Sequence, residues 1–211
     1  MNINLAINLG SKILRDKFIP NSQLDSEILM AKIINKDRNY ILLNSEYPIN
    51  KDDLNNFYKL IKKRSKGKPV AYLTKKKFFW NSEFFITDEV LIPRPDTELI
   101  VENVLKLTKQ KNKMNVLEIG IGSGCILLSI LKERENFYGT GIDISKKCIN
   151  ISKMNANNLK VSSRLKLYQT NVDKFNLGKY DLIVSNPPYI NKSNLKYLER
   201  DVAKYEPKLA L

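Results

Sequence analysis

The pattern of hydrophobic and polar residues changes character along the chain. In roughly the first 70 residues, apolar side chains recur at helical spacing, as at Leu24, Ile28, Leu29, Ile33 and Ile34. From Met114 onward, apolar runs of strand length alternate with helical stretches. Strands that alternate with helices indicate βαβ units and a parallel sheet. The pattern therefore predicts a small helical bundle followed by an α/β domain.

Between these two parts the residues become aromatic and β-prone. From Ala71 to Thr87 the pattern predicts a hairpin or an extended connector with its turn at Asn81-Ser82. Before it, a helix is expected to start after Asn50, whose side chain can cap it, and to end near Gly67. We accordingly divide the chain into a helical domain, a β-hairpin connector and an α/β domain, at residues 1–70, 71–90 and 91–211.

The α/β domain contains four predicted strands. They are expected at Asn115–Ile119, Phe137–Ile142, Leu165–Gln169 and Tyr180–Ser185. Helices are expected at Cys125–Glu133 and Ser145–Asn158, and another follows residues 91–98. Because ligands of parallel sheets bind at the carboxyl ends of the strands, functional residues are expected in the loops that follow them.

The composition is that of an ordinary soluble globular protein, with 43% hydrophobic and 27% charged residues among 211. No apolar run is long enough to span a bilayer, and the N-terminus lacks the features of a signal peptide, so we expect a cytoplasmic protein without membrane contact. There is no histidine, and the two cysteines are too far apart for a Cys-x-x-Cys motif. We therefore expect no metal, and any catalysis must work without imidazole.

The net charge of +14 is unevenly distributed. Residues 61–80 contain eight basic residues and no acid, whereas the first 60 residues contain eight bases and seven acids. Such a cluster favours an anionic or nucleic-acid-rich neighbourhood. The alternative is a solvated helix end and loop, and the sequence leaves both open.

A glycine-rich loop, Glu118-Ile119-Gly120-Ile121-Gly122-Ser123-Gly124, joins the first strand of the α/β domain to its helix. Alternating glycines allow a tight turn and a close approach of the backbone to a ligand. At the end of the second strand stands Asp143, a position from which an acid can accept hydrogen bonds from ribose hydroxyls. This arrangement predicts a nucleoside site.

The fourth strand ends in Asn186-Pro187-Pro188-Tyr189. Two prolines make this segment a rigid elbow, and neither supplies an N–H. The elbow therefore presents acceptors, the side-chain oxygen of Asn186 and backbone carbonyls, that suit a nitrogen carrying two hydrogens. The alternative interpretation is a strand terminator that merely turns the chain.

The spacing Glu-x-Gly-x-Gly-x-Gly resembles the first motif of the Rossmann-like (class I) S-adenosylmethionine-dependent methyltransferases, rather than the Gly-x-Gly-x-x-Gly of dinucleotide enzymes. The resemblance implies that Glu118 helps to order the methionine end of the cofactor, and that Asn171 and Val172 contact its adenine. In this superfamily Asn-Pro-Pro-Tyr marks methylation of a planar, weakly nucleophilic nitrogen. The cofactor-binding residues expected from this resemblance are Glu118, Gly120, Ile121, Gly122, Gly124, Asp143, Ile144, Asn171, Val172 and Asn186.

Three further segments narrow the resemblance. The chain closely resembles the release factor glutamine methyltransferases, the HemK/PrmC family, at residues 67–74, at Phe79-Trp80 and at the run Ile-Pro-Arg-Pro-Asp-Thr-Glu of residues 92–98. It also resembles this family at Asp25, Glu27 and Glu206-Pro207. The resemblance implies methylation of the glutamine amide in the Gly-Gly-Gln loop of bacterial peptide chain release factors, with the helical domain helping to hold the release factor. The residues implied in catalysis are Asn186, Pro187 and Tyr189. Those implied in substrate binding are Asn186, Pro187, Pro188, Tyr189, Arg94, Pro95 and Glu98.

The chain departs from this family in two places. Lys75 stands where the family usually has glycine, and the sequence stops at Leu211, soon after the fourth strand. We therefore expect a methyltransferase domain that lacks the C-terminal strands of its sheet. Two alternatives to the glutamine methyltransferase remain: a methyltransferase of adenine or guanine amino groups, and a truncated, non-catalytic fragment that binds cofactor or release factor. We expect a monomer, with ribosomal RNA as a further contact of the 61–80 cluster.

Overall fold

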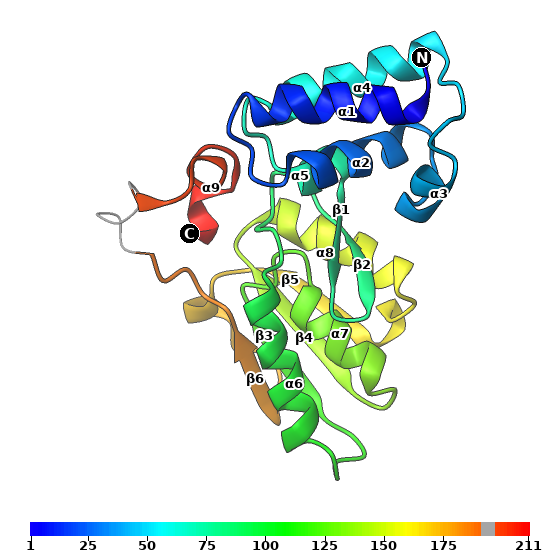
Figure 1. Cartoon of the computed structure of the whole chain (residues 1–211). Helices are drawn as coiled ribbons and strands as arrows, with labels where there is room; N and C mark the ends of the chain where they lie inside the picture. Colours follow the sequence, from blue (N-terminus) through cyan, green and yellow to red (C-terminus); the bar gives the residue numbers. More distant parts are fainter. Residues whose placement is uncertain (191–196) are drawn as a thin grey trace. The chain divides into compact units, whose positions relative to one another are not determined.

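A computed structural model describes residues 1–190 and 197–211 (Figure 1). The chain forms two compact units, one of Met1–Lys75 with Glu199–Tyr205 and one of Lys76–Leu198 with Glu206–Leu211. This division follows Lys75, whereas the sequence analysis ended the helical domain at residue 70 and began the α/β domain at residue 91. The three ranges stay predictions about functional domains.

The first unit is built from helices, with an isolated β-bridge between Asn2 and Pro48. Its helices are α1 (Ile3–Arg15), α2 (Ser22–Ile33), α3 (Arg38–Leu43), α4 (Lys51–Arg64), α5 (Val70–Thr74) and α9 (Arg200–Tyr205). The predicted cap of α4 is confirmed, because the Asn50 side chain accepts a hydrogen bond of 2.8 Å from the backbone N–H of Asp53. The core contains fully buried apolar side chains, among them Leu14, Leu29 and Phe57.

A buried ionic cluster of Asp25, Arg64 and Asp201 joins three helices of this unit. The Arg64 Nε donates to Asp25 Oδ2 at 2.7 Å and its Nη1 to Asp201 Oδ2 at 2.6 Å. The side chains of Arg64 and Asp25 are each only 10% exposed. Sequence reasoning counted Arg64 in the basic cluster at 61–80, but the structure places its charge inside the helical unit.

The second unit begins with a hairpin of β1 (Lys76–Phe79) and β2 (Ser82–Phe85). It continues with α6 (Glu98–Leu107), α7 (Cys125–Glu133) and α8 (Lys146–Asn158). Its strands β3 (Asn115–Ile119), β4 (Tyr138–Asp143), β5 (Leu165–Gln169) and β6 (Leu182–Ser185) form a parallel sheet in the order β5-β4-β3-β6. Short 3-10 turns lie at Pro95–Thr97, Ser162–Arg164, Val172–Lys174 and Lys208–Ala210. The predicted α/β fold with a parallel sheet is confirmed.

Two local predictions need correction. The stretch 71–74 is not extended, because Pro69 precedes the short helix α5 and the Thr74 hydroxyl bonds back to the Val70 carbonyl at 3.0 Å. This helix ends on Lys75 in the left-handed region, with φ of 61°, a conformation that favours the glycine usual in the family. The hairpin turn is Trp80-Asn81 rather than Asn81-Ser82.

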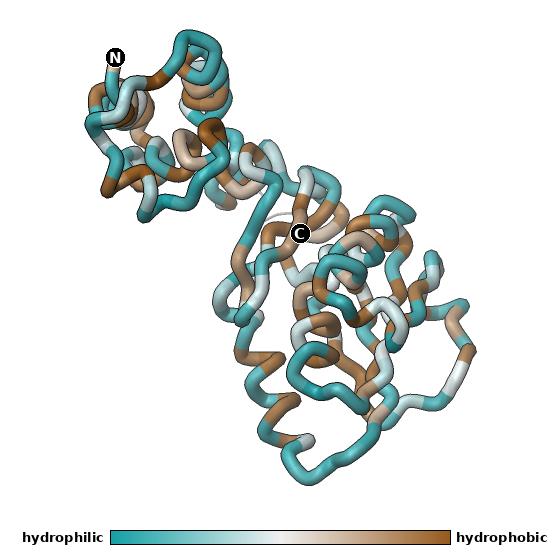
Figure 2. The backbone as a smooth tube through the Cα atoms, turned by 90° about the vertical axis from the view of Figure 1, so that its right-hand side faces the viewer, coloured by the Kyte–Doolittle hydropathy of each residue, from teal (hydrophilic) through white to brown (hydrophobic). Residues whose placement is uncertain are grey.

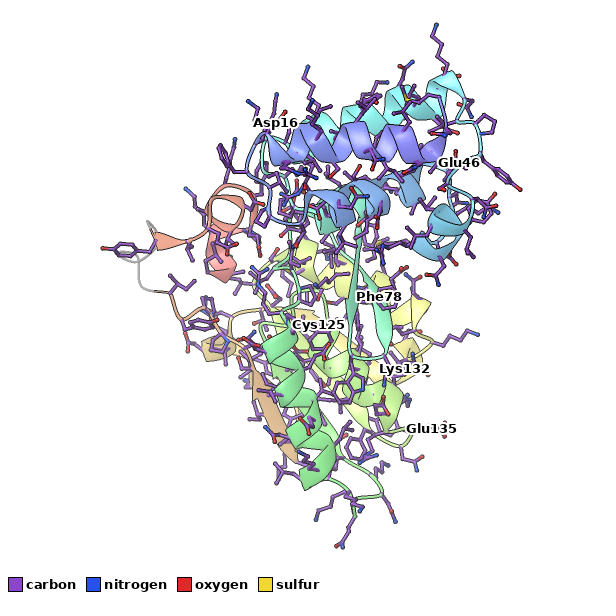
Figure 3. The ribbon with its side chains drawn as sticks, in the orientation of Figure 1. Asp16, Glu46, Phe78, Cys125, Lys132 and Glu135 are labelled. Carbon is purple, nitrogen blue, oxygen red and sulfur yellow. The ribbon has the colours of Figure 1, made fainter. Side chains whose placement is uncertain are left out.

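Contacts with helices α6 and α7 fix this turn. The Glu98 Oε1 atom accepts the Trp80 backbone N–H at 2.7 Å, and the Trp80 indole N–H donates to Glu133 Oε1 at 2.7 Å. Lys132, which points towards the hairpin in Figure 3, donates to Ser82 Oγ at 2.8 Å. Side chains far along the chain therefore select the turn conformation.

Hydrophobic and hydrophilic residues alternate in short stretches along the backbone (Figure 2). In residues 1–190 and 197–211, no helix is both long and apolar enough to cross a membrane.

Candidate functional site

A cavity of about 470 Å³ lies in the second unit at the carboxyl ends of its parallel strands. Its walls include the loops that follow β3, β4, β5 and β6, together with residues 89–91, 93–94 and 207–210. The sequence-predicted residues that line it are Glu118, Gly120, Ile121, Gly122, Asp143, Ile144, Asn171, Val172, Asn186, Pro187, Pro188 and Arg94. Four separate loops thus place the predicted nucleoside motif and the predicted elbow around one cavity.

The glycine loop presents bare backbone to this cavity. The N–H groups of Gly120 and Ile121 both donate to the Ile142 carbonyl, at 2.9 and 3.0 Å, which holds the loop against β4. A Cβ built on Gly120 would meet no atom within 4 Å, so the space beside it is open. Gly124 differs, because a Cβ there would lie 2.8 Å from the Leu128 side chain. Gly120 therefore leaves room for a ligand, whereas Gly124 allows the packing of α7.

Asp143 ends β4 with its carboxylate facing the cavity. Its Oδ2 accepts the Gly122 N–H at 3.0 Å and its Oδ1 accepts the Ser145 N–H at 2.9 Å. Each oxygen keeps a second acceptor position. The carboxylate is therefore fixed by the glycine loop and by the start of α8, and it can still accept hydrogen bonds from a ligand.

Glu118 is buried below the glycine loop, with 2% of its surface exposed. Its Oε2 accepts the N–H of Leu127 in the first turn of α7 at 3.0 Å. Burial raises the pKa of Glu118 to about 8; the hydrogen bond from Leu127 opposes this shift and the charge of Asp143 adds to it. At neutral pH the ligand-free protein therefore holds Glu118 mostly protonated.

This pKa predicts that the ligand-free protein loses stability as the pH rises. Between the ordinary carboxyl value of 4.5 and about 8, the unfolded chain has released the Glu118 proton and the folded chain retains it. We expect the free energy of unfolding to fall across this window by an amount on the order of 5 kcal/mol at most. Glu118→Gln should flatten the dependence, as measured by urea denaturation at pH 5, 6.5 and 8.

The control for this measurement is Glu135→Gln, which changes an exposed carboxylate beyond α7 (Figure 3). It should leave the pH dependence of the parent protein intact. If the free energy of unfolding depended on pH in the same way for Glu118→Gln and the parent, the pKa of Glu118 in the folded chain would not be raised.

Both cysteines line the cavity. Burial raises the pKa of Cys125 to about 12 and that of Cys148 to about 11. Both thiols are therefore neutral at physiological pH, and neither is poised as a nucleophile. Figure 3 shows Cys125 at the glycine-loop end of α7, where it packs as a small residue.

The elbow after β6 brings Asn186 to the cavity wall. The Asn186 Nδ2 donates to Thr97 Oγ1 at 3.3 Å, a contact between residues 89 positions apart. This bond uses an N–H of the amide and leaves its oxygen available as an acceptor. Thr97 also lines the cavity, and its proximity to Asn186 had no local signal in the sequence.

Arg94 is held at the cavity by Glu206. The guanidinium Nη2 pairs with Glu206 Oε1, while Glu206 Oε2 accepts the Ile92 N–H at 3.3 Å. The Glu206 side chain is 1% exposed, so this carboxylate is a buried anchor for the 92–94 segment and for the cavity wall that follows it. The resemblance named Glu206, but only the folded chain shows its partner.

Four predicted site residues lie outside the cavity lining: Gly124, Pro95, Glu98 and Tyr189. Glu98 is engaged with the hairpin turn through Trp80. Tyr189 is 82% exposed, which leaves its ring free to meet a large substrate.

Residues 6–74 match the PrmC N-terminal domain, and residues 95–203 match the methyltransferase small domain. The release factor glutamine methyltransferase of Leptospira interrogans is 40% identical over 208 residues, which cover 96% of this chain and 72% of the relative. The chain belongs to the release factor glutamine methyltransferase family. The member from Clostridium acetobutylicum is 37% identical over 89% of this chain and 67% of its own length. That from Buchnera aphidicola is 36% identical over 95% and 71%.

The cofactor of this methyltransferase family is S-adenosylmethionine, and the cavity suits it. The lining contains the carboxyl groups of Glu89, Glu118 and Asp143 alongside Arg94 and Lys208. A ligand with a sulfonium and an ammonium group suits these carboxyl groups, because its positive charge favours the ionised form of Glu118, which is protonated in the ligand-free protein. The open space beside Gly120 accepts a ligand close to the backbone. The volume of about 470 Å³ lies within the range of small-molecule sites.

Proposed function

We propose that this chain transfers a methyl group from S-adenosylmethionine to the side-chain amide nitrogen of the glutamine in the Gly-Gly-Gln loop of bacterial peptide chain release factors. Such methylation tunes translation termination. The observation that carries the proposal is the position of Asn186, which lines the same cavity as Asp143 and the glycine loop. We further propose that the enzyme acts in the cytoplasm as a monomer.

The chemistry must overcome the weak nucleophilicity of an amide nitrogen, whose lone pair is delocalised into the carbonyl. In this proposal the Asn186 side-chain oxygen and the Pro187 carbonyl each accept one hydrogen of the substrate –NH₂. Thr97 supports this role, because it binds the Nδ2 end of the Asn186 amide and so orients its oxygen away from Thr97. Tyr189, exposed beyond the elbow, packs against the planar amide of the glutamine.

When bound, the cofactor supplies an electrophilic methyl group on a positively charged sulfur. The acceptors on Asn186 and Pro187 orient the attacking nitrogen and stabilise the positive charge that develops on it. The methylated nitrogen is strongly acidic and then loses its proton to water. No general base is needed before transfer, which agrees with a sequence that contains no histidine.

The remaining predicted residues take cofactor and substrate roles in this proposal. Asp143 holds the ribose hydroxyls, Asn171 and Val172 contact the adenine, and Glu118 orders the methionine end. Gly120, Ile121, Gly122 and Ile144 supply the surface beside the cofactor, while Gly124 lets α7 pack behind the loop. Arg94, fixed by Glu206, lies where the substrate enters, with Pro95 and Glu98 supporting that entrance.

Radiolabelled S-adenosylmethionine tests the substrate. The purified chain should transfer label to a bacterial release factor and not to the same release factor with the Gly-Gly-Gln glutamine replaced by alanine. Ribosomal RNA and DNA serve as competing acceptors in the same assay. Label in nucleic acid alone would overturn the glutamine assignment, and cofactor binding without transfer to any acceptor would support a non-catalytic binding protein.

We retain contact with ribosomal RNA as a proposal for the lysines near the end of α4. Lys62, Lys63 and Lys66 are exposed there. The 61–80 cluster is a weaker nucleic-acid signal than the sequence alone indicated, because Arg64 is buried and Lys76 pairs with Glu83 at 2.8 Å. This lowers the support for nucleic acid as the methylated substrate.

A further inference from the structure

We propose that Ser152 and Asn155, on the buried face of α8, are positioning residues that set the shape of the cofactor cavity through backbone carbonyl groups. Ser152 lies outside the lining of the cavity, as does Asn155. The inference rests on the proposed function in one respect, namely that this cavity binds S-adenosylmethionine.

Asn155 joins the glycine loop to the hairpin. It is completely buried, and its Nδ2 donates to the Ser123 carbonyl and to the Phe85 carbonyl, each at 2.9 Å. Its Oδ1 accepts the Phe85 N–H at 2.8 Å. The Asn155 side chain thus satisfies the N–H and the carbonyl group of Phe85, the last residue of β2, and the carbonyl group of Ser123 in the glycine loop.

Ser152 lies one helical turn before Asn155 on the same face of α8 and is also completely buried. Its hydroxyl donates to the Gly122 carbonyl at 2.7 Å. The N–H of the same glycine donates to Asp143 Oδ2. The Gly122 residue is therefore held from both sides, by α8 through its carbonyl and by the ribose-site carboxylate through its N–H.

The same helix face also contacts a second segment of the cavity wall. Phe85, which Asn155 binds, lies four residues before Glu89. The segment that begins at Glu89 and ends at Arg94 contributes to the cavity lining. Cys148 lies on the same face, one turn before Ser152, and its thiol contacts the Glu89 carbonyl at 3.6 Å. The face of α8 therefore bonds to both the glycine loop and the start of the 89–94 segment, and in this proposal its side chains set the distance between them.

Energetics support a positioning role. Burial of an amide and a hydroxyl on the packing face of a helix is unfavourable unless they are hydrogen-bonded, and apolar residues would fill the same space without that requirement. The two side chains bind carbonyl groups of a loop that contains three left-handed glycines, Gly120, Gly122 and Gly124, and glycine backbone has wide conformational freedom. Polar residues here therefore hold a conformation that apolar packing could not specify.

Two variants test the proposal, Ser152→Ala and Asn155→Leu, which remove the donors while leaving the cavity lining unchanged. Isothermal titration with S-adenosylhomocysteine should show binding weakened about 10-fold or more in each. In methyl transfer, KM for the cofactor should rise similarly, while kcat at saturating cofactor stays within about threefold of the parent. In the ligand-free protein, the amides of Phe85, Gly122 and Gly124 should exchange hydrogen faster than in the parent.

Asn157→Ala is the matched control, since Asn157 is exposed on the same helix. It should leave affinity, KM and hydrogen exchange unchanged. Parent-like affinity in a folded Ser152→Ala variant would overturn the proposal, as would loss of kcat with unchanged affinity. If Asn155→Leu does not fold, Ser152→Ala decides alone. If neither folds, the two residues serve the fold rather than the cavity, and the proposal fails.

These outcomes are independent of the substrate assignment. S-adenosylhomocysteine binding involves no release factor, so a failure of methyl transfer to the release factor leaves the α8 measurement interpretable. Conversely, if both variants bound S-adenosylhomocysteine as tightly as the parent, the proposal for α8 would fail and the proposal of glutamine methylation would not be affected.

Discussion

Replacing Asn186 by alanine is expected to lower kcat for release factor methylation by about 100- to 1000-fold. The substitution removes the acceptor that orients the substrate nitrogen and stabilises the charge developing on it. The glycine loop and Asp143 keep their hydrogen bonds to β4 and to each other, so the affinity for S-adenosylhomocysteine should remain within a few fold of the parent. Single-turnover transfer and isothermal titration measure the two quantities.

Asp143→Ala provides the reciprocal control. It removes the carboxylate assigned to the ribose and one partner of the Gly122 N–H, so it should weaken cofactor binding first. Thr97→Val, which keeps the side-chain shape and removes the oxygen that binds Asn186, should reduce kcat in the same direction as Asn186→Ala but less. If Asn186→Ala lowered cofactor affinity and kcat by the same factor, Asn186 would act on the cofactor or the fold rather than on the nitrogen that receives the methyl group.

Replacing Arg64 by alanine is expected to destabilise the protein by about 3–5 kcal/mol. Arg64 pairs with Asp25 and Asp201 in the buried cluster of the helical unit, and its loss leaves these carboxylates without their shared cation. Burial already raises the pKa of Asp25 above 3.8, and Arg64 opposes that shift through its hydrogen bond and its charge. Without Arg64 the pKa of Asp25 should rise further.

The sign of the pH dependence follows from that shift. In the variant the folded-state pKa of Asp25 lies further above the unfolded value than in the parent. The stability deficit of the variant is therefore smallest near pH 4, and it grows as the pH rises from the folded-state pKa of the parent towards that of the variant. Urea denaturation at pH 4.5 and pH 7 measures the difference. The deficit should be clearly larger at pH 7.

Lys106→Ala is the control for Arg64→Ala. Lys106 pairs with Glu102 at 2.6 Å, but the two side chains are 67% and 44% exposed, so solvent screens the pair. Its removal should cost less than about 1 kcal/mol. Equal effects of the two substitutions would contradict the burial argument for the Asp25–Arg64–Asp201 cluster.

The sequence determined the elements whose causes are local. Strand β3, helix α7 and strand β5 lie within the predicted bounds, because short stretches rich in apolar residues and helical spacing specify them without tertiary help. Asn50 was identifiable as a cap because capping involves a backbone N–H three residues away. The glycine loop, Asp143 and the Asn186 elbow were readable for a related reason: in a parallel sheet, residues after successive strands meet at one edge.

Local signals failed where a distant group decides the conformation. The strand pattern over 71–87 was too extensive, because α5 occupies 70–74 and a contact from Glu98 sets the turn at Trp80. Arg64 looked like one charge of a surface cluster until the fold brought it to Asp25, 39 positions away, and to Asp201, 137 positions away. Periodicity carries no information about which distant charge a buried guanidinium will meet.

The sequence by itself determined which strand ends meet at the cavity, since the loops that follow the strands of a parallel sheet gather at one edge. Only the tertiary structure decided which residues of these loops line the cavity and what state they are in. The proton on Glu118 depends on burial, the orientation of the Asn186 amide on Thr97, and the shape of the glycine loop on Ser152 and Asn155. Each of these properties arises from desolvation or from a hydrogen bond between residues far apart in the chain, and such pairings exist only once the chain has folded.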